Sequence, residues 1–144
     1  MKTTVIVNPR AGNGRTGKIW PQIESALINS IGPFQTKKTS CRGDAINLTR
    51  QVLDEGTVRI VSIGGDGHLN EVLNGFIKND VPVNPEARLS FVMTGTGCDF
   101  QRSFDISGKW QATSEKLKDA QVRKIDIGKV TYTAADKSQR QMAR

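Results

Sequence analysis

SIGGDGHLNEVLNGF, residues 62–76, joins two apolar segments through a turn of two glycines, an aspartate and a third glycine. The β-branched run 58–63 predicts a buried strand before the turn. After the turn, apolar residues recur three and four positions apart, which predicts an amphipathic helix; they are Leu69, Val72, Leu73, Phe76 and Ile77. A glycine turn between a strand and a helix is therefore the first feature to explain.

The turn at Gly64, Gly65, Asp66 and Gly67 has the composition of a phosphate cradle. Glycines let a ligand approach the backbone closely, and the amides and macrodipole at the start of a helix favour an anion. A buried carboxylate on Asp66 would repel a bare phosphate. It suits a turn that holds Mg²⁺, grips a hydroxyl or accepts a proton in phosphoryl transfer. Alternatively, Asp66 shapes the turn and caps the helix.

The rest of the chain repeats the alternation of strand and helix. Further strands are expected at 3–7, 34–39 and 89–93, further helices at 17–31, 44–56 and 110–120, a loop at 80–85 and a strand-like run from 123 to 133. Pro21 is expected in the first turn of its helix, Asp44 as an N-cap and Gly56 at C′. This order predicts an α/β fold, with a mostly parallel sheet covered by helices on both faces.

Two more glycine turns follow expected strands, at 8–19 and 93–104. The first contains GxGxxG and the beginning of a Walker A motif, but Ile19 stands where Walker A needs a hydroxyl ligand for Mg²⁺. Lys37 and Lys38 replace the acidic residue that a dinucleotide site expects on the second strand, which leaves an NADP-type site as an alternative. All three turns are expected at the carboxyl ends of strands, where open α/β sheets bind ligands.

Composition narrows the class of protein. The 144 residues carry a net charge of +7 with 24% charged residues, as expected for one soluble domain whose basic surface attracts phosphates or anionic lipid. We expect no nucleic-acid function, because zinc-finger spacing and RNA-binding aromatic signatures are missing. We expect no transmembrane segment, because no apolar run approaches about 20 residues. Two cysteines without metal-ligand spacing indicate a cytoplasmic protein.

Taken together, the three turns resemble the diacylglycerol-kinase catalytic-domain family, which includes bacterial lipid kinases and sphingosine kinases. Residues 64–72, GGDGHLNEV, are similar to the family signature GGDGT-x-NEV, and residues 95–102, GTGCDFQR, to GTGNDFAR. Asn8 and Pro9, with Gly12 after them, are similar to the opening motif. His68 stands in place of the usual threonine and Cys98 in place of the usual asparagine.

This resemblance implies two domains. Residues 1–128 would form an ATP-binding domain related to phosphofructokinases and NAD kinases, and residues 129–144 would begin a β-rich C-terminal domain, with the polar tail as a frayed strand pair. Asp66 and Glu71 would be catalytic, Asp99 would help to organise the site or its Mg²⁺, and no metal ligand is assigned. The nucleotide contacts would be Asn8, Thr39, Gly64, Gly65, Asp66, Gly67, His68, Leu69, Asn70 and Thr96.

The function expected from this resemblance is transfer of the γ-phosphoryl group of ATP to a lipid hydroxyl, with Mg²⁺, by a cytoplasmic protein working at the membrane surface. An exposed strand edge in the tail would allow a homodimer. Two alternatives stay open. One is an NAD-kinase-like enzyme that phosphorylates a soluble hydroxyl compound, and the other is a nucleotide-binding module without catalysis.

Overall fold

The computed structural model describes residues 1–104, 106, 108–135 and 139–143. Its centre is a four-stranded parallel sheet in the order β2-β1-β3-β6. The strands are β1 (Thr3–Val7), β2 (Gln35–Lys38), β3 (Arg59–Gly64) and β6 (Arg88–Met93). Because the chain leaves β1 first to one side and then to the other, the strand order reverses between β1 and β3, where such sheets bind ligands.

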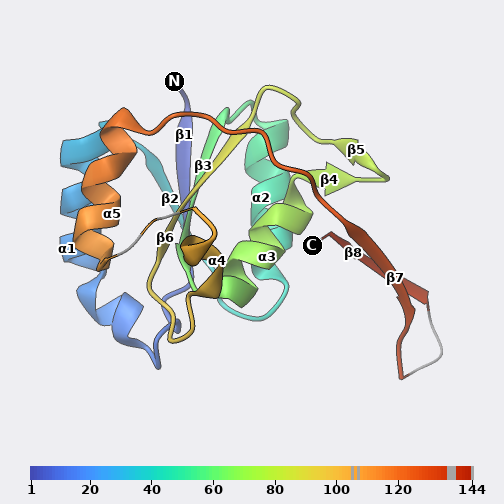
Figure 1. The fold of residues 1–144 in the computed structure, drawn as a ribbon. Coiled ribbons are helices and arrows are strands. Elements are labelled where there is room, and N and C mark those ends of the chain that lie inside the picture. The colour runs from blue at the N-terminus through green and yellow to red at the C-terminus, as the bar shows by residue number, and fades with distance from the viewer. Residues whose placement is uncertain (105, 107, 136–138, 144) are drawn as a thin grey trace.

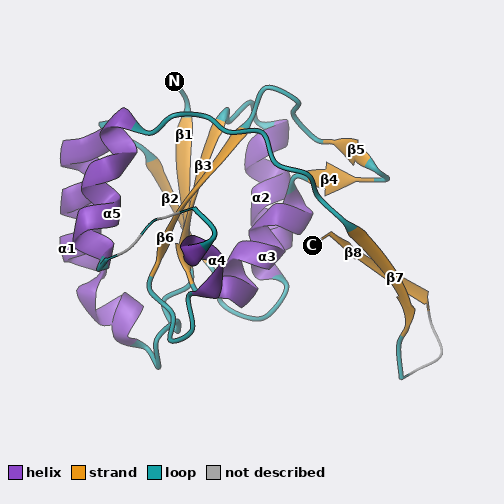
Figure 2. Ribbon diagram, in the orientation of Figure 1, coloured by secondary structure: helices purple, strands orange, loops and turns teal. Residues whose placement is uncertain are grey.

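Helices cover both faces of the sheet, as Figures 1 and 2 show. On one face lie α1 (Arg15–Ile31), α5 (Trp110–Lys116) and the 3₁₀ turn η1 (Leu117–Asp119); on the other lie α2 (Asp44–Asp54) and α3 (Asp66–Gly75). Alternate residues of β1 pack against the helices on opposite faces of the sheet. Val5 and Val7 pack toward α1, and Ile6 packs toward α2 and α3. Burial on both faces explains the apolar runs of the central strands β1 and β3, whereas the edge strand β2 is polar and partly exposed. The predicted fold class is confirmed.

Three sequence-based details of the helices were wrong. Helix α3 ends at Gly75, so Ile77, which was expected within it, lies instead in β4 (Ile77–Lys78). Helix α1 begins at Arg15, directly after Gly14 in a left-handed conformation, so Pro21 lies in its second turn instead of its first. The N-cap of α2 is Gly43, and Asp44 is the first helical residue. The carboxylate of Asp44 accepts bonds from the amide and hydroxyl of Ser40, at 2.7 and 2.6 Å, and so braces the turn before the helix.

The remaining elements are small. Strands β4 (Ile77–Lys78) and β5 (Val81–Pro82) form a hairpin partly within the expected loop 80–85, and α4 (Asp99–Arg102) follows the third glycine turn. In the expected strand-like run, pairing begins only at β7 (Lys129–Thr133), whose partner is β8 (Gln139–Ala143). Residues 136–138 and 144 of the expected tail lie outside the described part of the chain.

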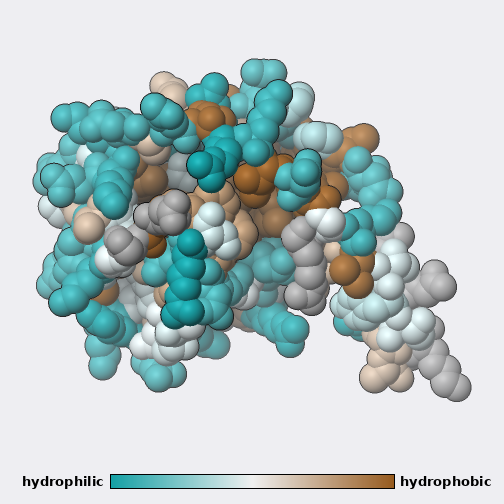
Figure 3. Space-filling view, viewed as in Figure 1, coloured by the Kyte–Doolittle hydropathy of each residue, from teal (hydrophilic) through white to brown (hydrophobic). Residues whose placement is uncertain are grey.

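The β7–β8 hairpin projects from the body (Figure 1), and every residue of β7 is exposed. Apolar surface gathers around β4, β5 and the segment that leads to β7 (Figure 3). The exposed apolar side chains of that region are Val81, Val122, Ile125, Ile127, Val130 and Tyr132. Within the described residues, no helix is both long enough and apolar enough to span a bilayer.

We expect Gly75→Ala to destabilise the fold by about 1 to 3 kcal/mol, because a methyl group at the end of α3 would overlap the Cβ of Thr49 on α2. The measurement is the free energy of unfolding in urea. Ser25→Ala, on the exposed side of α1, is the matched control and should stay within about 0.5 kcal/mol of the wild type. Equal stability of Gly75→Ala and wild type would mean that α2 and α3 pack less closely than described.

Candidate functional site

The three glycine turns meet at the carboxyl ends of β1, β3 and β6, where they enclose a cavity of about 340 Å³. Its volume lies at the lower end of the range for ligand pockets. Every turn contributes to its lining, which consists of Asn8, Ala11, Gly12, Gly65, Asp66, Gly67, His68, Gly95, Thr96 and Gly97. The three turns, which were expected at the carboxyl ends of strands, therefore share one cavity.

The second and third turns lie against each other because Gly95 has no side chain at the contact. A Cβ on Gly95 would lie 2.6 Å from the Cα of Gly65. The amide of Thr94 donates to the carbonyl of Gly64 at 2.8 Å and extends the pairing of β3 with β6 into the turns. The first turn joins them at Gly12, whose φ is +63° and where a Cβ would lie 2.8 Å from the carbonyl oxygen of Thr94.

Asp66 ties the second turn to α4. One carboxylate oxygen accepts from the amide of Asp99 at 3.0 Å, and the other accepts from the amide of Phe100 at 3.2 Å. Asp66 therefore caps α4, not the helix α3 that it begins. Its side chain is half-buried, so the expectation of a buried carboxylate was wrong: the carboxylate lies at the wall of an open cavity.

The amides of the first two turns differ in what they bind. At the start of α1, the amide of Thr16 donates to the carbonyl of Ala11 and that of Gly17 to the carbonyl of Pro9. In α3, the amides that precede Leu69 lack carbonyl partners within the helix, and this end of α3 lines the cavity. An anion is therefore better accommodated at Gly65–Gly67 than in the Gly12–Gly17 loop, which disfavours the NADP-type alternative.

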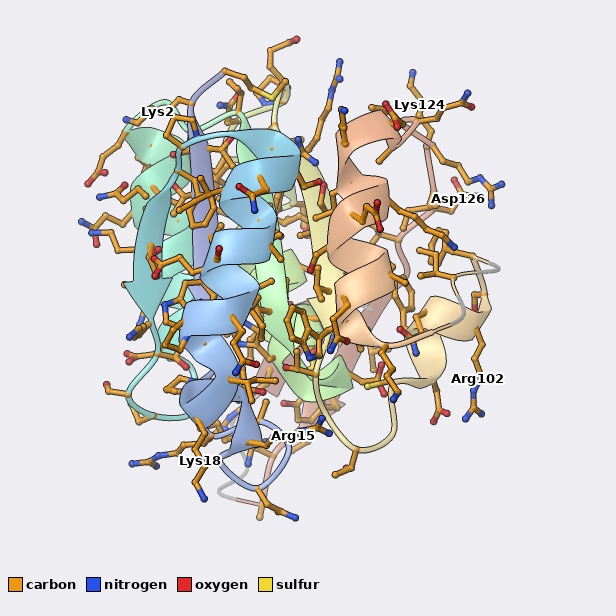
Figure 4. All side chains as sticks on the ribbon, turned by 90° about the vertical axis from the view of Figure 1, so that its left-hand side faces the viewer. Lys2, Arg15, Lys18, Arg102, Lys124 and Asp126 are labelled. Atoms are coloured by element: carbon orange, nitrogen blue, oxygen red, sulfur yellow. The ribbon has the colours of Figure 1, made fainter. Side chains whose placement is uncertain are left out.

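Cationic side chains surround this end of the molecule. Arg15 and Lys18, in the first turn of α1, lie with Arg102 toward the end of the sheet that bears the cavity, whereas Lys2 and Lys124 lie toward the opposite end (Figure 4). Arg15, Lys18 and Arg102 are exposed, and Arg102 pairs with Asp99 at 3.1 Å. The cations favour an anionic ligand near the cavity mouth.

A metal ion would have to use the carboxylates of Asp66 and Asp99. Both face Gly97: a Cβ there would lie 3.5 Å from an oxygen of Asp66 and 3.9 Å from one of Asp99. Among the described residues, no three His, Cys, Asp or Glu side chains form a metal-binding group. Two carboxylates suit Mg²⁺ that takes its remaining ligands from water and phosphate, so the donor set fits a metal–nucleotide complex.

His68 is an uncharged part of the cavity wall. Its side chain is 6% exposed, and its Nε2 lies 3.0 Å from the carbonyl oxygen of Ile6, so Nε2 carries the proton. Burial lowers the pKa of His68, against smaller opposing effects of that carbonyl and of Glu71. The ring lies against Gly64, where a Cβ would be 2.7 Å from it. The substitution thus fills the space above a bare backbone without adding charge.

Cys98, the other departure from the family pattern, adopts a left-handed conformation with φ of +53°. Its thiol donates to the carbonyl of Gly95 at 3.1 Å. Burial, followed by the nearby charge of Asp66, raises the pKa of the Cys98 thiol. The side chain is therefore a protonated hydrogen-bond donor that closes the third turn.

The residues expected to contact nucleotide fall into two groups. Asn8, Gly65, Asp66, Gly67, His68 and Thr96 line the cavity, and Gly64 adjoins it. The others lie outside the lining: the Thr39 hydroxyl donates to the carbonyl of Val7, Leu69 is buried in the core, and Asn70 donates to the carbonyl of Ala143.

Glu71, expected to be catalytic, accepts from the amide of Gly43 with both carboxylate oxygens at 3.1 Å, and so ties α3 to the start of α2. The lining also includes Ala11, Gly12, Gly95 and Gly97, which were not among the expected contacts. Their position in the glycine turns, beside residues that were expected to contact nucleotide, could have identified them as part of the lining.

We expect the stability of the wild type to fall more between pH 7 and pH 5 than that of His68→Gln. Because the pKa of His68 is lowered in the folded state, the unfolded chain binds a proton below pH of about 6.5 that the folded chain does not, so stability decreases as pH falls. Urea unfolding at both pH values measures the difference.

A change in stability between pH 7 and pH 5 can be assigned to His68 because it is the single histidine of the chain. Asp44, whose pKa is lowered chiefly by the Ser40 hydroxyl, titrates below 3.8 and outside this window. Parallel pH dependences of the two proteins would contradict the burial of a neutral His68.

Known proteins with similar sequences match the region of the chain that contains the three glycine turns. The diacylglycerol kinase catalytic domain profile matches residues 2–130. A Bacillus subtilis protein named "Putative lipid kinase YtlR" is 34% identical over 139 residues, which cover 93% of this chain and 43% of that protein. The Bacillus subtilis protein named "Diacylglycerol kinase" is 28% identical over 130 residues, with 90% and 42% covered.

A crystal structure of a diacylglycerol kinase from Bacillus anthracis matches with a TM-score of 0.74 at 24% identity, over 90% of this chain and 43% of that one. That likeness establishes the shared fold. The chain spans less than half the length of these curated relatives. Since the profile covers most of the chain and all three glycine turns, the chain belongs to the diacylglycerol kinase catalytic domain family.

Proposed function

We propose that this chain is the ATP-binding part of a lipid kinase, which transfers the γ-phosphoryl group of ATP to a lipid hydroxyl. The observation that carries the proposal is the convergence of three glycine turns on one cavity at the head of α3. Family membership supports phosphoryl transfer, and the names of the relatives support a lipid acceptor. In this proposal the protein binds peripherally to the cytoplasmic side of the membrane, where it reaches the lipid acceptor.

In this proposal the backbone at Gly65 and Gly67 cradles the phosphates, with Asn8 and Thr96 on the facing walls. The exposed Arg15 and Lys18 draw the anionic nucleotide toward the cavity. His68, neutral and held by Ile6, fixes the turn without pairing with a phosphate. Because the cradle consists of backbone already held in place, little rearrangement accompanies binding.

The carboxylates of Asp66 and Asp99 are the groups that would hold Mg²⁺. A carboxylate has about four lone-pair sites, and Asp66 uses two of them for the amides of Asp99 and Phe100. The remaining lone pairs are free to face a cation without releasing α4. When bound, Mg²⁺ supplies neutralising charge to the transferred phosphoryl group.

We also propose that residues 1–128 form the nucleotide-binding domain, and that 129–144 belong to a second, β-rich one. The support is the exposed apolar set at Val122, Ile125, Ile127 and Val130, together with the greater length of the relatives. An apolar surface of this kind is typical of an interface with another part of a protein.

We expect Asp66→Asn to weaken Mg·ATP binding by about tenfold or more, as loss of one charged metal ligand would, and to leave binding of ATP in EDTA unchanged or tighter. The second effect follows because the variant removes a negative charge from beside the phosphates. Isothermal titration with and without Mg²⁺ measures both dissociation constants. Asp54→Asn, an exposed carboxylate at the end of α2, is the matched control.

Equal weakening of ATP binding with and without Mg²⁺ would show that Asp66 acts through the packing of α4 and not through a metal. Tight binding of NADPH, with the same dissociation constant in wild type and Asp66→Asn, would place the ligand in the Gly12–Gly17 loop and overturn the kinase proposal.

The acceptor is tested by transfer of radiolabelled γ-phosphate from ATP to diacylglycerol in anionic mixed micelles, compared with NAD at the same concentration. We expect labelled lipid and no labelled NAD. Labelled NAD would favour the NAD-kinase-like alternative. ATP binding without labelling of either acceptor, in this chain and in one extended to the length of its relatives, would favour the non-catalytic module.

A further inference from the structure

The C-terminal hairpin is attached to the body in an unusual way. All five residues of β7 are exposed, so this strand lacks the apolar packing that normally stabilises a two-stranded sheet. Its ion pair, Lys129 with Asp80 at 3.0 Å, is exposed and contributes little. Yet Ala143, at the end of β8, is 9% exposed and lies against α3.

Two asparagines of α3 bind the backbone of Ala143. The amide of Ala143 donates to Oδ1 of Asn74 at 2.6 Å, and its carbonyl accepts from Nδ2 of Asn74 at 3.2 Å and from Nδ2 of Asn70 at 2.9 Å. A side-chain amide thus pairs with the backbone as a neighbouring strand would. Nδ2 of Asn74 also donates to the backbone carbonyl of Asn70 at 2.8 Å, which orients the amide group.

The helix that carries these asparagines begins at the GGDG turn. Asp66, Asn70 and Asn74 are four residues apart and lie on one side of α3. The pairing therefore lies about 6 to 12 Å along the helix from the cavity wall.

We infer that Asn70 and Asn74 form a backbone clamp that holds strand β8 on α3, and that both are positioning residues. Asn70, which the family resemblance places among the nucleotide contacts, acts on the C-terminal strand and not on the nucleotide. The clamp binds a peptide group and not a side chain, so its hydrogen bonds need no particular side chain at position 143, although proline there would lack the donor amide. The clamp itself is independent of the proposed function; only the statement that Asn70 does not contact the nucleotide rests on that proposal.

The test is amide hydrogen exchange of Ala143 in the full chain, by NMR or by mass spectrometry of a peptide spanning residues 139–143. We expect Asn74→Ala to speed exchange of the Ala143 amide roughly tenfold or more, because that amide loses its acceptor. Asn74→Asp, which keeps Oδ1, should retain more of the protection. Asn29→Ala, on the exposed side of α1, is the control, and unchanged protection of β3 amides would confirm that the variants fold.

Equal exchange rates at Ala143 in wild type and Asn74→Ala would overturn the clamp. For Asn70, we expect Asn70→Ala to increase exchange in the same peptide and to change the dissociation constant of Mg·ATP by less than about threefold. A tenfold weakening of Mg·ATP binding with unchanged exchange would make Asn70 a nucleotide contact and overturn its assignment here. If the wild type binds no Mg·ATP, the proposed function fails, and the exchange of Ala143 in Asn74→Ala decides the clamp by itself.

Discussion

The approach of Gly65 to Gly95 is the constraint on which the rest of the site depends. The turns after β3 and β6 can meet this closely only if position 95 has no side chain, since a Cβ on Gly95 would overlap the backbone of Gly65. Because they meet, Asp66 reaches the first amides of α4, and residues from three separate loops enclose one cavity. The parallel sheet supplies the other condition, because it brings the carboxyl ends of β1, β3 and β6 to one edge.

The charges around the cavity favour a particular kind of ligand. Backbone amides at the head of α3 favour an anion, while the carboxylates of Asp66 and Asp99 on the same side oppose one. A ligand that is anionic at one end and accompanied by a divalent cation satisfies both. The neutral state of His68 fits this arrangement, because a buried positive charge there would compete with the metal for the phosphates. The electrostatics thus support the proposed metal–nucleotide complex over a free phosphate.

Much of the fold could be predicted because its signals are local. The runs of apolar residues that form β1 and β3 need only the burial of a central parallel strand, and the stripe of α3 needs only helical periodicity. The start of α1 was misplaced because Gly14 ends the first turn earlier than Pro21 suggested. Sequence spacing could not reveal that Asp66 caps α4, since that contact joins residues 33 and 34 positions apart. The same holds for Glu71 and Gly43, which are 28 positions apart.

Helix α3 explains why the signature stretch continues beyond the turn itself. His68 binds β1 through the carbonyl of Ile6, Glu71 binds the start of α2, and Asn70 and Asn74 bind β8. These side chains hold a helix of 10 residues from three directions. A turn at the head of a helix held in this way cannot shift without breaking polar contacts, so the amides that would face a phosphate are positioned before a ligand arrives. Residues such as Glu71 can then matter for chemistry without touching the reacting groups, because they fix the helix that carries the cradle.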